Sequence, residues 1–125
     1  MNDELFESNF AKRADFVKKQ YSIDDDLFDL LLGCSKIYKA DLSDLFNVCV
    51  AAYTVQKPLF LYAKTCRFPS VSHTFLLSKQ NSAKLVRMRE RYGISLSLLV
   101  NSSLAFSLKG KEAGKYIHFD GPERD

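Results

Sequence analysis

The chain has 125 residues, 46% hydrophobic and 26% charged, with a formal net charge of +3. This composition predicts one compact globular domain. No apolar run approaches the roughly 18–20 residues needed to cross a bilayer, so we expect no membrane contact. The charge is uneven: residues 1–63 carry seven Lys/Arg against ten Asp/Glu (net −3), and residues 64–125 carry eleven against five (net +6). A basic second half favours an anionic partner, although basic helices are often merely solvated.

The three cysteines are widely spaced and form no C-x-x-C pair. Cys34 and Cys49 fall on apolar positions, and we interpret them as reduced core residues rather than zinc ligands. The acidic start of the chain lacks the basic-then-apolar layout of a secretion signal. We therefore expect a cytoplasmic protein.

The chain contains one segment twice. Residues 38–53 reappear as residues 92–107 at a constant offset of 54 with no gap. Six pairs are identical: Tyr38/Tyr92, Leu42/Leu96, Ser43/Ser97, Leu45/Leu99, Asn47/Asn101 and Ala51/Ala105. A fixed period indicates a repeated supersecondary unit that cannot bury its apolar face alone, so we expect the two copies to pack on each other.

The repeat predicts an organisation in chain order. We expect an N-terminal helical segment at 1–15, repeat one at 16–56, a linker at 57–70, repeat two at 71–109 and a tail at 110–125. In the first segment, Phe6 and Phe10 suggest an amphipathic helix that packs on the core or on a partner. In the tail, residues 115–119 suggest either an added strand or a docking segment, and the last six residues are typical of disorder.

Repeat one reads as a strand followed by two helices. Residues 18–23 alternate in polarity, which predicts a strand. Asp24 is a helix-capping residue, and the apolar stripe after it predicts a helix that ends near Tyr38. Lys39 then stands at the turn, and Asp41 is placed to cap a second helix that runs to about Tyr53.

Repeat two has the same order. Residues 71–77 are β-prone, and Ser78 is placed to cap a helix that ends at Tyr92. Gly93 supplies the left-handed residue that often ends helices, and Ser95 is placed to cap the last helix, which runs to about Leu108. A single strand per repeat leaves its backbone groups without partners, so we expect the two strands to pair antiparallel over four helices. The predicted fold class is mainly α with a short two-stranded antiparallel ribbon.

This pattern resembles the ribbon-helix-helix superfamily of Arc- and MetJ-type DNA-binding proteins. The resemblance rests on the alternating strand, on Tyr-Gly-Ile-Ser-x-Ser at 92–97 and on the Leu-Leu-Val-x-x-x-Leu that follows. It covers about 18–54 and 72–108, and two copies in one chain are similar to tandem relaxosome accessory proteins of conjugation systems. The resemblance implies a tandem ribbon-helix-helix pseudo-dimer in one chain.

In that superfamily the outward side chains of the paired strands read bases in the major groove. Carried onto this chain, the base-reading residues are Lys18, Gln20, Ser22, Ser72, Thr74 and Leu76. Leu76 departs from the pattern, because a leucine reads no hydrogen-bond code; it either touches a thymine methyl or indicates a different register.

The resemblance also implies that the start of each second helix faces the DNA backbone. Ser95 and Ser97 suit a phosphate at such a helix start, whereas Asp41 and Asp44 at the equivalent start oppose one. We expect Arg87 and Arg91 to add to the positive field near the phosphates.

The resemblance therefore implies a sequence-specific double-stranded DNA-binding protein, acting as a conjugation or plasmid accessory factor or as a transcriptional repressor. A relaxase is an expected kind of protein partner, and we expect a monomer that self-associates on DNA. The alternative is a protein-interaction module that kept the fold without DNA binding. The sequence contains no nucleophile–base motif, metal-ligand spacing or phosphate-binding glycine loop, so we expect no enzyme activity and no cofactor.

Overall fold

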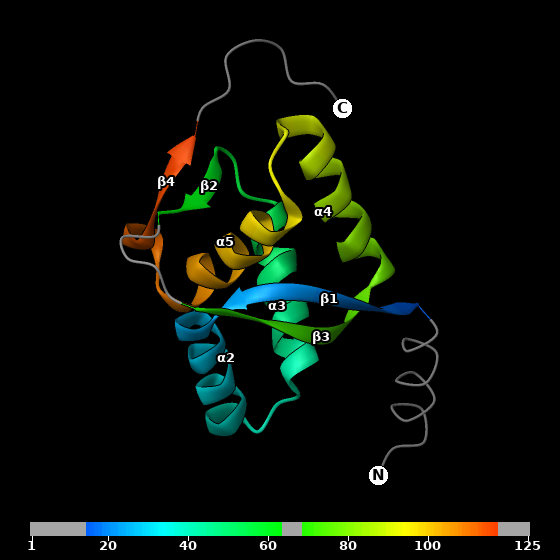
Figure 1. Cartoon of the computed structure of the whole chain (residues 1–125), viewed down its shortest axis with the longest axis vertical. Helices are drawn as coiled ribbons and strands as arrows, with labels where there is room; N and C mark the ends of the chain where they lie inside the picture. The colour runs from blue at the N-terminus through cyan, green and yellow to red at the C-terminus, as the bar shows by residue number, and fades with distance from the viewer. Residues whose placement is uncertain (1–14, 64–68, 118–125) are drawn as a thin grey trace.

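The computed structural model describes residues 15–63 and 69–117 (Figure 1). The expected N-terminal helix at 1–15 and the end of the tail fall almost wholly outside these residues. The elements in chain order are β1 (Phe16–Asp24), α2 (Asp25–Tyr38), α3 (Leu42–Thr54), β2 (Leu59–Tyr62), β3 (Ser70–Ser78), α4 (Lys79–Tyr92), α5 (Leu96–Leu108), a 3-10 turn (Lys111–Ala113) and β4 (Gly114–Ile117). None of the helices in these ranges has the length and apolar character needed to cross a membrane.

The internal repeat appears directly in the secondary structure. The elements β1, α2 and α3 recur as β3, α4 and α5, each displaced by 54 residues at both ends. Strands β1 and β3 pair antiparallel from Phe16↔Ser78 to Asp24↔Ser70. The middle pair is Gln20↔Thr74, two residues that are themselves 54 apart. The two strands therefore pair symmetrically about this point, and the predicted antiparallel pairing is confirmed.

Local chemistry explains where the helices begin and end. The hydroxyl of Ser78 accepts a hydrogen bond from the Asn81 amide at the start of α4 (3.1 Å). Asp24 stands at the equivalent start of α2, but its side chain makes no cap hydrogen bond. At the helix ends, Gly93 has φ +66° and Lys39 has φ +50°. Lys39 thus takes the left-handed conformation that glycine adopts at lower cost.

The predicted fold class, mainly α with a single ribbon in a tandem ribbon-helix-helix pseudo-dimer, is wrong. Strands β2 and β4 form a second antiparallel sheet, so that 58% of the described residues are helical and 27% lie in strands: a mixed α/β fold. Strand β2 lies inside the segment expected to be a linker. A four-residue strand is too short for a polarity pattern to reveal, and it forms here because its backbone finds a partner in β4. For the tail, the structure has the strand, at Gly114–Ile117.

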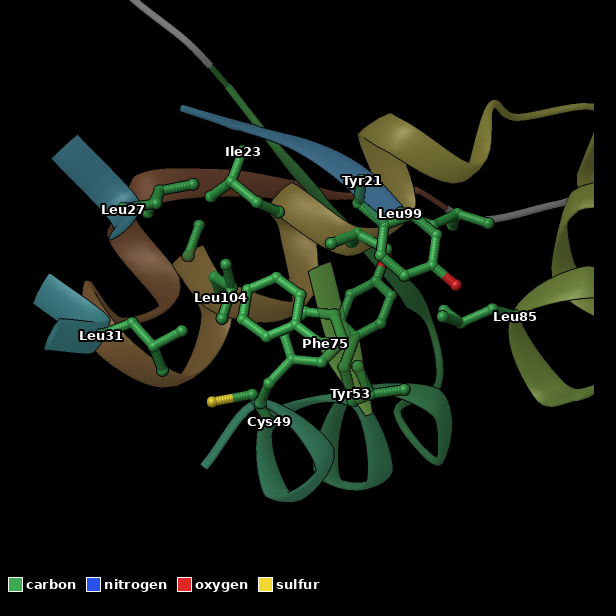
Figure 2. Packing of buried hydrophobic residues seen from close by; sticks show 14 of the residues in the cluster. Tyr21, Ile23, Leu27, Leu31, Cys49, Tyr53, Phe75, Leu85, Leu99 and Leu104 are labelled. Carbon is green, nitrogen blue, oxygen red and sulfur yellow. The ribbon is translucent and has the colours of Figure 1, made fainter. Parts of the chain in front are cut away.

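Helix α5 lies between the two sheets (Figure 1). All residues from Leu99 to Ala105 are buried, including the two serines at 102 and 103. The amide of Tyr62 in β2 donates to Ser102 Oγ (2.9 Å), which ties the second sheet to this helix. Figure 2 shows side chains of both repeats meeting in one core, with Leu27 of α2, Phe75 of β3 and Leu104 of α5 among them.

Candidate nucleic-acid interface

The outer face of the β1–β3 sheet is the candidate interface. Burial alternates along both strands: Tyr21, Ile23, Phe75 and Leu77 are buried. The six predicted base-reading residues all lie on the exposed face, which we call the reading face: Lys18, Gln20, Ser22, Ser72, Thr74 and Leu76. The register joins them as three cross-strand pairs, Lys18↔Leu76, Gln20↔Thr74 and Ser22↔Ser72. The structure thus brings all six together on one two-stranded surface.

The reading face offers different chemistry along its length. At its centre, the Gln20 amide can donate and accept, and the Thr74 hydroxyl can do both and also offers a methyl group. At one end, the ammonium of Lys18 lies beside Leu76, whose side chain is 37% exposed. At the other end are Ser22 and Ser72. Because the two strands differ at every equivalent position of the reading face, this face is symmetric in backbone and asymmetric in side chains.

Two equivalent asparagines, Asn101 and Asn47, form hydrogen bonds to the backbone of this sheet. Asn101 of α5 accepts from the Asp24 amide (2.9 Å) and donates to the carbonyl oxygens of Ser22 (2.9 Å) and Ser97 (2.8 Å). Because α5 belongs to repeat two and β1 to repeat one, Asn101 holds the strand of the other repeat. We call this set of hydrogen bonds, together with its equivalent at Asn47, the cross-repeat clasp.

Asn47 of α3 repeats this arrangement on β3. It accepts from the Ser78 amide (2.9 Å) and donates to the carbonyl oxygens of Leu76 (2.7 Å) and Ser43 (2.8 Å). All three partners are those of Asn101 shifted by 54 residues. The sequence shows that the residues at 47 and 101 are both asparagine, but it does not show that they bind the strand backbone. Such a clasp limits the movement of the reading face, which keeps its side chains positioned for a ligand.

The starts of α3 and α5 flank the two edges of the sheet. The Ser43 hydroxyl accepts from the Leu76 amide (3.0 Å), and the Ser97 hydroxyl donates to the Ser22 carbonyl (3.4 Å). Each contact joins a helix start to the strand of the other repeat. The two helix starts are thus positioned beside the two strands that carry the reading face.

The two helix starts differ in charge. Ser95 caps α5 by accepting from the Leu98 amide (3.2 Å), whereas Asp41 caps α3 by accepting from the Ser43 amide (2.8 Å). Asp44, in the first turn of α3, adds a second carboxylate. A phosphate is favoured beside a neutral helix start and opposed beside two carboxylates. The start of α5 is therefore the better phosphate site.

Arg87 and Arg91 do not join the reading face. They line a groove of about 690 Å³ between α4 and the end of α3, and no residue of β1 or β3 lies among the described residues that line it.

The His73 side chain lies on the core side of β3. It stacks on Phe28 of α2 with ring centroids 3.7 Å apart, which supports a structural role.

A polar cluster that the sequence did not indicate joins α2, β2 and the end of α5. The Lys109 ammonium forms an ion pair with Asp26 and lies 3.3 Å from the Tyr62 hydroxyl. The hydrogen bond to Asp26 is the main reason that the pKa of Lys109 is raised. The cluster connects the second sheet to repeat one.

Across residues 15–63 and 69–117, no three His, Cys, Asp or Glu side chains group as metal ligands would.

Comparison with known proteins gives no family: no family model, no curated protein and no solved structure matches this chain. The resemblance to the ribbon-helix-helix superfamily therefore stays a prediction.

Proposed function

We propose that the protein binds double-stranded DNA sequence-specifically, with the reading face in the major groove. The supporting observation is the set of three exposed cross-strand pairs on a two-stranded sheet whose other face places Tyr21, Ile23, Phe75 and Leu77 in the core. A two-stranded ribbon fits a major groove about 12 Å wide. Amide, hydroxyl and ammonium groups are the side chains that read base edges there. Lys18, Gln20 and Thr74 carry these groups.

The DNA site of this proposal is asymmetric. Two halves of a symmetric reader would require a palindrome, but here Lys18 is equivalent to Ser72 and Ser22 to Leu76. The phosphate contact is asymmetric as well, since Ser95 and Ser97 flank one edge and Asp41 flanks the other. Such a protein suits a directional site, as an accessory factor in plasmid conjugation or a repressor would have, and acts in the cytoplasm.

The test is selection from random duplex DNA over a salt series, followed by affinity measurements on the enriched site. Gln20→Ala and Thr74→Ala should each lower the preference for the enriched site by roughly 1–3 kcal/mol if a base contact is lost. Lys36→Gln, which changes an exposed residue outside the reading face, serves as the control. Equal preference in the wild type and both reading-face variants would refute base reading by this face.

The two helix starts provide a second test, because Ser95 and Asp41 are equivalent cap residues and each can be replaced by the residue found at the other start. Ser95→Asp should weaken binding at low salt and Asp41→Ser should strengthen it, each by about fivefold, the effect of one unit charge about 4 Å away in water. Both variants keep a residue that caps helices. Unchanged affinity in both would remove the helix starts from the interface.

A protein-interaction module is the second candidate function, and exposed apolar side chains on β3 favour it. Leu76 is 37% exposed on the reading face, and Val71 is 50% exposed on the opposite face of the same strand. If selection enriches no DNA site even at low salt, this candidate replaces the first. A Leu76→Asp variant that no longer captures a protein partner, such as a relaxase, would then identify the surface.

A further inference from the structure

The groove beside α4 has the composition of an anion-binding site. It has a volume of about 690 Å³, and its lining includes Lys57, Lys84, Arg87 and Arg91 but a single carboxylate, Glu90. The side chains at 84, 87 and 91 follow one stripe of the helix, because residues three and four apart are neighbours on a helix surface. Pockets of 300–1,000 Å³ are of the size that takes small molecules.

The fold does not require these charges. The residues of α2 equivalent to Lys84, Arg87 and Arg91 are Leu30, Gly33 and Ile37, at the same offset of 54. Helix α2 nevertheless has the same length and the same position in its repeat as α4. Cations that are neighbours on one helix repel one another and lower its stability. Within the described residues, Lys84 and Arg87 make no hydrogen bond or ion pair that would offset this.

The groove also has an apolar part. Met88 and Tyr92 are half-buried in its lining, and the Arg91 guanidinium lies 5.5 Å from the centre of the Tyr92 ring. Thr54 and Gln56, from the end of α3 and the loop after it, add a hydroxyl and an amide. The lining thus combines clustered cations, neutral hydrogen-bonding groups and an apolar surface.

We propose that this groove binds a phosphate-bearing ligand. A terminal phosphate places nearly two negative charges and three acceptor oxygens at one point, and successive backbone phosphates place one charge each along a line; both match several cations on one stripe. Arginine presents paired donors that fit phosphate oxygens in a bidentate way. The phosphate has two possible sources, a free nucleotide or the backbone of nucleic acid. The apolar residues of the lining give a nucleotide base a surface to contact.

Calorimetric titration of the full chain with ATP and with inorganic pyrophosphate tests the site. Lys84→Gln combined with Arg87→Gln should reduce affinity by about a hundredfold or more, since each lost charged hydrogen bond weakens binding by about tenfold or more in general. Arg89→Gln is the matched control, because it removes an exposed cation of the same helix that does not line the groove. Its affinity should stay within about twofold of the wild type.

Duplex DNA in the same titrations identifies the source. ATP binding that persists when DNA is bound supports a free nucleotide as the ligand. Competition between ATP and DNA, with weaker DNA binding in the Lys84/Arg87 double variant, supports the nucleic acid backbone. The proposal is overturned if the wild type shows no saturable binding of ATP or pyrophosphate and the double variant binds DNA like the wild type. It is also overturned if Arg89→Gln loses as much affinity as the double variant. These outcomes do not depend on the reading face, which Gln20→Ala tests separately.

Discussion

Replacing Asn101 with alanine tests whether the cross-repeat clasp holds the β1–β3 sheet. The substitution removes three hydrogen bonds, two to the backbone of β1 and one within α5. Each intramolecular hydrogen bond contributes about 0.5–1.5 kcal/mol net. Asn101 and Asp24 are only 6% and 7% exposed, so water does not readily replace the lost partner of the Asp24 amide. We expect the free energy of unfolding to fall by about 2–4 kcal/mol, a large part of the roughly 5–15 kcal/mol typical of a domain.

Urea denaturation followed by circular dichroism measures this change. The midpoint should fall while the dependence on urea stays the same, because the variant exposes a similar surface on unfolding. Asn47→Ala removes the equivalent bonds at a half-buried site and also a fourth bond, which the buried Asn81 amide donates to Asn47 Oδ1 (3.0 Å), so its loss should be similar to that of Asn101→Ala. Lys36→Gln, at an exposed position of α2, is the surface control. A loss for Asn101→Ala below about 0.5 kcal/mol, which is the usual range of surface substitutions, would refute the clasp.

Three further predictions concern stability. Gly114→Ala should destabilise the protein by about 1–3 kcal/mol in the same assay, because its Cβ would lie 2.2 Å from a backbone oxygen of β2; an unchanged midpoint would argue against this close approach. Lys109→Met should lose stability relative to wild type at neutral pH. Because the hydrogen bond to Asp26 raises the pKa of Lys109 above its ordinary 10.5, that difference should be complete between neutral pH and about pH 10.5 and should be lost as the pH rises through the raised value; the same difference on both sides of this range would contradict it. Lys39→Gly should raise the free energy of unfolding by up to about 1 kcal/mol, and Gly93→Lys should lower it by about 1–2 kcal/mol, since the left-handed conformation favours glycine; unchanged midpoints in both variants would show no strain at either turn.

The sequence alone determined the repeat and most of its elements. The 54-residue offset is a comparison of the chain with itself, so no knowledge of contacts was needed to find it. The capping residues and the alternation of β1 and β3 act over a few residues, which is why the helix starts and the exposed strand residues agree with the structure. The wrong fold class came from β2, whose four residues carry too little pattern to stand out from a linker, and from β4, for which a docking segment remained an equal alternative.

The tertiary structure decided which groups meet. The sequence contains Asn47 and Asn101, but an amide side chain has no role until a particular backbone lies within its reach, and here that backbone belongs to the other repeat. The same holds for the groove, where Lys57 of the loop after α3 joins the basic stripe of α4. The middle of helix α5, Leu99–Ala105, is buried on all sides only because α3 and two sheets, each sheet assembled from segments far apart in the chain, pack around it. Local patterns set the conformation of a segment, whereas sites and cores arise from contacts between distant segments, which no local pattern records.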